Sequence, residues 1–329
     1  MVLVTGGTGF LGAYILIELV EKGHRVRAIR REGKAAPFFI PEAINKKIEW
    51  VTGDVLDTFD LQEAMKDVDT VIHSAGKVSF DSGDREALFQ VNVEGTANVV
   101  NVAIESEVRK FIHISSVASL GRTANGETVT EEKDWEESSM NTTYAQSKHK
   151  GEMEVWRGAA EGLDTVILNP STIIGYGNWN ESSCRLFKTV YDEFPYYTNG
   201  INGFVYVKDV AEIATTLCTS QISGERFLVT GENWSFRDLF NSIADEFKKK
   251  RPHFNATPLL AQLAWRAEKI KSLFNGKRAL LTKESARIAQ STTYFDNSKI
   301  LKALPSLAFT PLTEAVSISC RQYLANLQQ

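Results

Sequence analysis

Cysteine and histidine are both scarce in this 329-residue sequence. The three cysteines, Cys184, Cys218 and Cys320, lie far apart and form no C-x-x-C pair. Such an odd, sparse set indicates reduced thiols and argues against a disulfide framework or a cysteine-based zinc site. The five histidines are scattered and suggest no metal site either. We therefore expect no bound metal and a cytoplasmic location.

Long apolar runs are also missing. No stretch approaches the roughly 18 residues that a membrane-spanning helix needs. The first predicted strand begins at Val2, which leaves no room for a signal or transit peptide. A net charge of -4 gives no general attraction to phosphate backbones or anionic lipid, and the basic run Lys248–Arg251 fits a solvated helix end. These features argue against membrane and nucleic-acid partners.

Short apolar runs alternate with segments of helical periodicity over the first two thirds of the chain. Leu11, Ile15 and Leu19 recur at four-residue spacing, as in a helix that packs one face on a sheet. Strands that alternate with such helices predict an α/β fold with a doubly wound parallel sheet. The expected strands are Val2–Thr5, Arg25–Ile29, Ile48–Thr52, Thr70–Ser74, Lys110–Ser115 and Thr165–Leu168, and the clearest helices are Leu11–Lys22 and Glu86–Glu105.

After Pro170 the alternation loosens. We expect loops with one helix, then a strand and helix that return to the main sheet, then a strand and two helices of a second lobe. Ser235, three residues before Asp238, predicts a helix cap. The main domain would cover residues 1–170 plus 204–220, and a smaller, discontinuous substrate-binding lobe 171–203 plus 221–329. The expected elements are a helix near Arg185–Glu193 within the loops Ser171–Gly203, the returning Phe204–Val207 and Lys208–Thr219, and the second-lobe Arg226–Thr230, Ser235–Lys249 and Leu259–Phe274.

A glycine-rich segment, Thr5-Gly6-Gly7-Thr8-Gly9-Phe10-Leu11-Gly12, follows the first strand and opens the first helix. Gly6 permits a tight turn, Gly9 lets the backbone approach a pyrophosphate, and Gly12 lets helix and strand pack closely. The free N–H groups and the positive end of the helix would then hold the phosphates. A turn with no ligand is the alternative. The strand–turn–helix context favours dinucleotide binding and hence a Rossmann-type fold.

The end of the second strand decides between NAD and NADP. In an NAD site, an acidic residue there would bind the ribose 2′-OH. This sequence has Arg30 and Arg31, and arginine suits a 2′-phosphate. Two exposed arginines with no ligand are the alternative, and Glu32 is a candidate 2′-OH partner. We predict NADP(H), with NAD as the second choice.

Tyr144 and Lys148 are four residues apart, which places both side chains on one face of a predicted helix. A neighbouring ammonium lowers the pKa of a tyrosine, so the pair can donate a proton to a carbonyl oxygen or remove one from an alcohol. Ser115-Ser116 and Asn169-Pro170 each end a predicted strand. Both ends lie at the carboxyl edge of the sheet, where ligands of open α/β sheets bind.

Together these motifs resemble the extended short-chain dehydrogenase/reductase family, across essentially the whole chain. Gly53-Asp54 and His73-Ser74-Ala75-Gly76, which follow the third and fourth strands, also match it. The resemblance implies that Ser116 binds the substrate oxygen and that Tyr144 is the general acid/base. It implies that Lys148 holds the nicotinamide ribose and depresses the tyrosine pKa.

The same resemblance implies the cofactor contacts. Asp54 and Val55 would border the adenine, and Ala75-Gly76 would line the nicotinamide side. The predicted cofactor-binding set is Thr5, Gly6, Gly9, Phe10, Leu11, Gly12, Arg30, Arg31, Asp54, Val55, Ser74, Ala75, Gly76, Lys148 and Pro170.

Three further residues match the family but have simpler explanations. Asn92 lies on a helix, where catalysis and the bracing of strands are equally good interpretations. Asp209 stands at the start of a predicted helix, so an N-terminal cap explains it without substrate contact. His73 lies beside the cofactor motif, and we expect a core or loop residue there.

Within the family, the chain most resembles dihydroflavonol-4-reductase-like proteins. The segments that carry this resemblance are Val26–Arg31, Leu280–Ser285 and Tyr294–Lys299. It implies reduction of a ketone or aldehyde, in which NADPH gives a hydride to the carbonyl carbon while Tyr144 protonates the oxygen. It does not imply a flavonoid substrate, since the second lobe sets specificity.

Two other functions stay open, a nucleotide-sugar epimerase or dehydratase and a redox sensor. A nucleotide-sugar epimerase that retains its NAD would need a basic pyrophosphate clamp, which Arg185, Arg226 and Arg237 could supply. A dehydratase would want an acid beside Ser116, where the sequence has Val117-Ala118-Ser119 instead. A redox sensor that binds NADP without turnover usually lacks the tyrosine or the lysine, and both are kept.

The substrate pocket is expected to be closed by Gly121–Asn141 and Ser171–Gly203. Their aromatic side chains favour a small apolar or aromatic carbonyl compound over a free sugar, although ordinary packing would also explain them. The family often dimerises through two helices, here Glu86–Glu105 and Tyr144–Glu161, so we expect a monomer or a homodimer. The aromatic residues are Trp135, Trp179, Phe187, Tyr191, Tyr196 and Tyr197.

Overall fold

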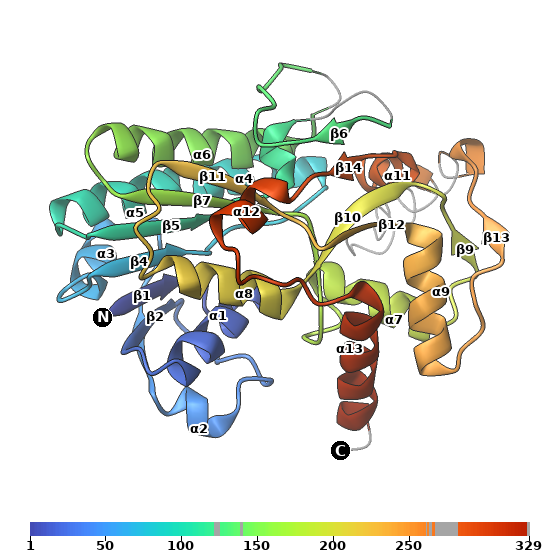
Figure 1. Cartoon of the computed structure of the whole chain (residues 1–329), viewed down its shortest axis with the longest axis horizontal. Coiled ribbons are helices and arrows are strands. Elements are labelled where there is room, and N and C mark those ends of the chain that lie inside the picture. The colour runs from blue at the N-terminus through green and yellow to red at the C-terminus, as the bar shows by residue number, and fades with distance from the viewer. Residues whose placement is uncertain (122–125, 139–140, 261, 263–264, 267–281, 328–329) are drawn as a thin grey trace.

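A parallel sheet forms the centre of the molecule (Figure 1). The structure is a computed structural model, and it describes every residue except 122–125, 139–140, 261, 263–264, 267–281 and 328–329. Among the described residues this sheet has seven strands in the order β11-β7-β5-β4-β1-β2-β3, and every neighbouring pair is parallel. The strands are β1 (Val2–Thr5), β2 (Val26–Arg30), β3 (Ile48–Thr52), β4 (Thr70–His73), β5 (Lys110–Ile114), β7 (Thr165–Pro170) and β11 (Glu225–Val229).

Helices cover both faces of the sheet, as the doubly wound prediction requires. Alternate residues of a strand point to opposite faces. Accordingly, Val2 and Val4 belong to one buried core and Leu3 to the other. Figure 1 shows α5 and α6 over one face and α1 and α8 under the other. The helices on one face are α1 (Phe10–Glu21) and α8 (Val207–Leu217). Those on the other face are α3 (Thr58–Ala64), α5 (Gly95–Glu105) and α6 (Thr143–Ala160).

The strand order reverses between β1 and β4. The chain adds β2 and β3 on one side of β1 and then crosses to β4 on the other side. The carboxyl ends of β1 and β4 therefore stand at a topological switch point, where open α/β sheets bind their ligands. The predicted Rossmann-type sheet is confirmed, and its strand bounds agree with the prediction to within a residue or two.

Two predicted strand placements are wrong. β10 (Ile201–Tyr206) does not return to the main sheet but pairs with β8 (Thr172–Ile174) and β12 (Glu232–Ser235) in a separate sheet. β11, expected in the second lobe, instead takes the edge position beside β7. Both segments are short apolar runs. Such a pattern predicts that a strand is buried, but it does not predict which strand it pairs with. The helix α8 does return, and it packs on α1.

The predicted helix Glu86–Glu105 is interrupted. It consists of α4 (Arg85–Phe89), a π-helical turn at Gln90–Glu94, and α5. Ser235 accepts the Asp238 N–H at 3.0 Å and so forms the predicted cap. Most of the predicted helix Leu259–Phe274, and Leu280 and Leu281 of the family signature, lie outside the described residues.

The remaining elements lie mostly to one side of the main sheet (Figure 1). The three cysteines are unpaired. No helix in the described ranges is long and apolar enough to cross a membrane. The further elements are α2 (Glu42–Asn45), α7 (Arg185–Tyr191), α9 (Phe236–Phe247), α11 (Lys283–Gln290), α12 (Ser298–Ala303), α13 (Leu312–Leu327), β6 (Thr128–Val129), β9 (Tyr196–Tyr197), β13 (Phe254–Asn255) and β14 (Tyr294–Phe295).

Candidate active site

The glycine loop lies between the carboxyl ends of β1 and β4. Gly6 has a φ of +74°, and a Cβ there would lie 2.5 Å from the Ala75 nitrogen. A Cβ on Gly12 would lie 2.1 Å from the Gly6 carbonyl oxygen. Gly9 precedes α1 and has no side chain to cap it, so the first N–H groups of the helix have no capping side chain. The loop and helix end therefore have the form of a phosphate cradle.

Thr5 and His73 join β1 to the segment that follows β4. Thr5 Oγ1 accepts a hydrogen bond from the Ala75 N–H at 3.2 Å and lies 2.7 Å from His73 Nδ1. The other ring nitrogen of His73 lies 3.0 Å from Thr96 Oγ1. Burial, and to a lesser extent Lys148, lower the pKa of His73 to about 3. His73 is thus a neutral core residue, as expected from the sequence.

Arg30 and Arg31 differ in their surroundings. The Arg30 guanidinium lies over the Trp50 ring, 5.6 Å from its centroid, while Arg31 is exposed. The Trp50 indole donates to Asn45 Oδ1 at 2.8 Å. A Cβ on Gly7 would lie 3.5 Å from the same indole ring. The Trp50 ring therefore lies beside both Arg30 and Gly7 of the glycine loop.

Asp54 and Val55 follow β3. The Asp54 carboxylate accepts the Leu56 N–H at 3.0 Å, which closes a local turn. Val55 is buried against α5, where a Cβ on Gly95 would lie 2.9 Å from Val55 Cγ2. Both residues thus stand beyond the carboxyl end of β3, on the side of the sheet that carries Arg30.

The predicted catalytic side chains meet at the end of β5. Thr142 caps α6 by accepting the Ala145 N–H at 3.0 Å, and the helix then carries Tyr144 and Lys148 on one face. Ser116 lies close enough to Tyr144 for its hydroxyl to lower the pKa of the phenol, against the effect of burial. The Lys148 ammonium donates to the Ile114 carbonyl at 2.9 Å. A Cβ on Gly76 would lie 3.9 Å from that ammonium nitrogen, so the predicted nicotinamide side borders the same face.

The pKa values of these groups differ from the expectation. Burial raises the pKa of Tyr144, and the nearby Ser116 hydroxyl only partly offsets this effect. The Lys148 ammonium binds the Ile114 carbonyl, and the pKa of Tyr144 is raised where the sequence predicted a lowered one. Burial lowers the pKa of Lys148 to about 8, and the Glu152 carboxylate acts in the opposite direction. Tyr144 is thereby held in its protonated form.

Asn92 and Asp209 have structural partners. The Asn92 amide accepts the Lys77 N–H at 2.7 Å and donates to the Lys77 carbonyl and to Ser147 Oγ, both at 2.9 Å. These contacts favour the bracing interpretation. Asp209 is not the helix cap, because α8 is capped at Tyr206 and Asp209 instead accepts the N–H and hydroxyl of Thr310. The predicted capping role is therefore wrong.

Most of the predicted pocket aromatics pack within the second lobe. Phe187 is fully buried, Trp179 stacks on Tyr323, and Tyr191 contacts Phe247 edge to face. These contacts are ordinary packing. Phe80, which the sequence did not single out, lies edge to face with Tyr144 at a centroid distance of 5.8 Å.

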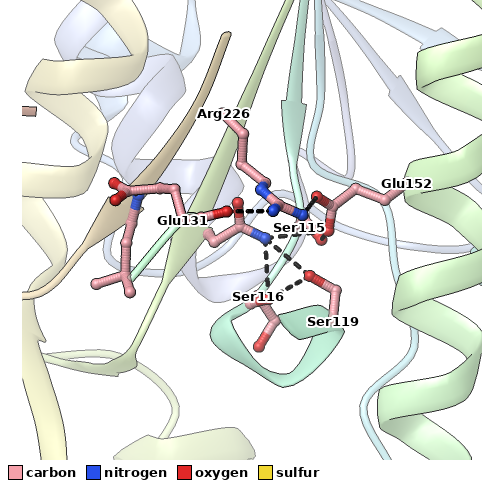
Figure 2. A network of polar contacts seen from close by, with 8 residues as sticks. Ser115, Ser116, Ser119, Glu131, Glu152 and Arg226 are labelled. Carbon is pink, nitrogen blue, oxygen red and sulfur yellow. Dashed lines mark hydrogen bonds and ion pairs between the residues drawn. The ribbon is translucent and has the colours of Figure 1, made fainter. Parts of the chain in front are cut away.

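A buried polar network beside Ser116 was also missed (Figure 2). The Glu152 carboxylate accepts hydrogen bonds from Ser115 at 2.8 Å and from Asn169 at 3.0 Å, and it forms an ion pair with Arg226 at 3.5 Å. Asn169 was noticed only as a strand end. The available signal was the position of Glu152, four residues after Lys148 on the same helix face.

The fold and the site define a Rossmann-type, dinucleotide-dependent enzyme with a serine, a tyrosine and a lysine at its centre. The chain belongs to the NAD dependent epimerase/dehydratase family, whose model matches residues 2–230. This confirms the resemblance to the NAD(P)-dependent enzymes of the extended short-chain dehydrogenase/reductase type.

Several relatives carry reductase names. A Synechocystis protein with a provisional dihydroflavonol 4-reductase name is 30% identical over 92% of this chain and 88% of its own length. Cinnamoyl-CoA reductase 1 of Petunia hybrida is 31% identical over 69% of this chain and 72% of its own. The crystal structure of gox2253 superposes with a TM-score of 0.82 at 28% identity, covering 99% of this chain and 98% of the other.

Epimerases share the fold. The NAD complex of Thermus thermophilus UDP-glucose 4-epimerase superposes with a TM-score of 0.76 over 98% of both chains. Its identity to this chain is 19%, so the likeness concerns the architecture alone.

Proposed function

We propose that this protein is an NADP(H)-dependent oxidoreductase that reduces a ketone or an aldehyde to an alcohol. The observation that carries the proposal is that Ser116 follows β5 and lies close enough to Tyr144 for its hydroxyl to lower the pKa of the phenol, while Lys148, on the same face of α6, binds the Ile114 carbonyl at the end of β5. A hydroxyl that holds a carbonyl oxygen and a phenol that protonates it are the two groups such a reduction needs. The reductase names of two relatives, 30% and 31% identical to this chain, add support.

The side chains divide the chemistry between them. NADPH, when bound, supplies the hydride that reaches the carbonyl carbon. The Ser116 hydroxyl holds the carbonyl oxygen, and the Tyr144 hydroxyl donates its proton to that oxygen. Burial suits Tyr144 to this role, because a raised pKa keeps the proton on the phenol until the oxygen becomes basic. Lys148 holds the nicotinamide ribose through its ammonium.

The residues present suit a dinucleotide. A Cβ on Gly9 would meet only the Gly6 carbonyl oxygen, at 3.2 Å, so the cradle stays open on its outer side. The uncapped N-terminus of α1 would hold the pyrophosphate. Arg30, held over Trp50 beside this loop, would bind a ribose 2′-phosphate, which is why we propose NADP(H) over NAD(H).

Phe80 favours an apolar substrate. Its ring lies edge to face with the ring of Tyr144, so it borders the position where the carbonyl group must sit. An aromatic wall there stabilises an aromatic or apolar substituent by packing and offers no hydrogen bond to a sugar hydroxyl. We therefore propose a small apolar or aromatic carbonyl compound.

The epimerase alternative loses part of its basis. Arg226 was one of three arginines offered as a pyrophosphate clamp, but its guanidinium binds Glu152 and the Glu131 carbonyl oxygen. Arg237 lies over the Tyr197 ring. Arg237 and Arg185 are both exposed, so the clamp loses Arg226 alone.

Turnover stoichiometry tests the proposal. A reductase consumes one NADPH for each carbonyl reduced, whereas an epimerase recycles its hydride and leaves bulk cofactor absorbance flat. A sensor would bind the cofactor and do neither. A screen of aromatic and aliphatic carbonyl compounds by NADPH absorbance, with product quantified by chromatography, separates the three. No NADPH oxidation with any carbonyl compound, together with isomerisation of a nucleotide sugar, would refute the proposal.

The Tyr144→Phe variant tests the proton donor. It removes only the transferable proton, so kcat should fall by about 10²–10⁴ with NADPH affinity little changed. Full activity of this variant on a substrate that the unmodified protein reduces would exclude Tyr144 as the donor.

We also propose the division into a main domain of residues 1–170 plus 204–220 and a second lobe of 171–203 plus 221–329, except that β11 pairs with the main sheet and β10 pairs outside it. A cytoplasmic location and a monomer or homodimer remain part of the proposal. Sedimentation analysis of the purified chain distinguishes the two assembly states.

A further inference from the structure

A chain of buried polar contacts leads from the edge strand β11 to the turn that carries Ser116 (Figure 2). Arg226, on β11, pairs with the Glu152 carboxylate of α6 and also donates to the carbonyl oxygen of Glu131. The Glu131 carboxylate in turn accepts the Leu228 N–H at 2.6 Å, which ties the same loop to β11. Three segments far apart in the sequence are thus joined behind the catalytic serine.

Glu152 determines how the Asn169 side chain is oriented. The Asn169 amide nitrogen lies 3.0 Å from Glu152 Oε2, an atom that also accepts the Ser115 hydroxyl. Glu152 is completely buried, and an ionised carboxylate only accepts hydrogen bonds. The opposite orientation would set the amide oxygen against the carboxylate, so the charge keeps the NH₂ group on this side.

The same NH₂ group holds the backbone of the catalytic serine. It lies 3.1 Å from the Ser116 carbonyl oxygen and 2.8 Å from Ser119 Oγ. Ser119 also donates to the Ser116 carbonyl at 2.8 Å, within the short helical turn Val117–Leu120. In this orientation Asn169 therefore holds the backbone of the turn that carries the Ser116 side chain.

Stability alone is a weak reason for this arrangement. A buried ion pair loses hydration that its attraction often fails to offset, so apolar packing would serve a structural purpose as well or better. Of the two partners, Glu152 has a side chain that is 1% exposed and Arg226 one that is 20% exposed. Glu152 is joined to the Ser116 carbonyl through one residue, Asn169.

We propose that the Arg226–Glu152 ion pair positions the Ser116 hydroxyl at Tyr144 by fixing the Asn169 amide. Arg226, Glu152 and Asn169 are then positioning residues, which act on the reaction only through Ser116. The inference rests on the proposed carbonyl reduction, and it adds to that proposal three residues from outside the Tyr–Lys pair.

The test is a double-mutant cycle on the full chain with the carbonyl substrate found by the NADPH screen. Glu152→Gln keeps the size of the side chain but has one acceptor oxygen instead of two. We expect kcat to fall by about tenfold or more while the Kd for NADPH changes by less than about twofold. In a Ser116→Ala background the same change should lower kcat by less than about twofold, because its only target has been removed.

The control is a second ion pair in the main sheet, at the amino end of β5 and away from the Ser116 turn. Lys110, at the start of β5, pairs with Asp164, just before β7, at 3.0 Å. Asp164→Asn should lower the unfolding temperature and leave kcat within about twofold of the unmodified protein. Arg226→Lys keeps the positive charge opposite Glu152 and should retain more kcat than Arg226→Met.

The outcomes separate the inference from the proposed function. If the unmodified protein reduces no carbonyl compound, the proposed function fails first. If it does, an unchanged kcat in Glu152→Gln, or losses that multiply in the Ser116→Ala background, would overturn the inference. If Glu152→Gln does not fold, Arg226→Met removes the ion pair from its less buried partner, and an unchanged kcat in that variant overturns it equally.

Discussion

The Lys148 ammonium donates a hydrogen bond of 2.9 Å to the Ile114 carbonyl oxygen at the end of β5. This contact joins the helix that carries Tyr144 to the strand that leads to Ser116. It also holds the ammonium in a buried position, where the cost of desolvating the charge lowers the pKa of Lys148 to about 8. The residue proposed to hold the cofactor ribose therefore titrates close to neutral pH.

A pH dependence follows from this pKa. Below about pH 8 Lys148 is protonated and can hold the ribose, and above it the charge is lost. We expect kcat/KM for NADPH, which reports the free enzyme, to fall as the pH rises through about 8. Lys148→Arg keeps its charge throughout this range, so any remaining activity should lack that limb. If kcat/KM for the arginine variant falls over the same pH range, the titrating group is not Lys148.

Cofactor choice should depend more on Arg30 than on Arg31. Arg30 is held over Trp50 beside the glycine loop, whereas Arg31 is exposed. We expect NADPH to bind at least about tenfold more tightly than NADH, equivalent to about 1.4 kcal/mol. Replacing both arginines with alanine should erase most of this preference and leave the NADH affinity nearly unchanged, with Arg30→Ala alone accounting for the larger share. Equal affinities by fluorescence titration in the unmodified protein would contradict the argument.

The glycine loop offers a paired test of folding against binding. A Cβ on Gly12 would lie 2.1 Å from the Gly6 carbonyl oxygen, so Gly12→Ala should destabilise the fold by about 1–3 kcal/mol. A Cβ on Gly9 would be 3.2 Å from its nearest neighbour, so Gly9→Ala should fold nearly normally yet bind NADPH more weakly. Thermal unfolding and cofactor titration on both variants check this. Normal NADPH binding by Gly9→Ala would show that the pyrophosphate does not approach that residue.

Phe80 should discriminate between substrates. Phe80→Ala removes the ring that lies 5.8 Å from the Tyr144 ring and should lower kcat/KM for an aromatic carbonyl substrate by about tenfold. A small aliphatic aldehyde does not reach the same wall, and its kcat/KM should stay within about twofold. Equal losses for both substrates would indicate that Phe80 supports Tyr144 and does not select the substrate.

Local patterns were sufficient for much of the fold. The strand β1 and the helix α1 were predicted almost to the residue, because apolar spacing reports which side of an element is buried. The glycine loop and the Tyr144–Lys148 spacing are equally local, since each depends on residues within one turn of structure. The positions of these two motifs on a loop and on a helix could therefore be predicted from the sequence.

Contacts between residues far apart in the chain could be found only in the folded structure. Glu152 meets Arg226, which is 74 residues away in the sequence, and Asp209 meets Thr310, 101 residues away. β11 joined the main sheet and β10 joined the separate sheet, the reverse of the prediction. The sequence of a short apolar strand does not specify which strand it pairs with. The pKa of Tyr144 likewise depends on burial and on Ser116, and spacing along one helix reports neither. Contacts between distant segments depend on how the elements pack, and local periodicity does not record that packing.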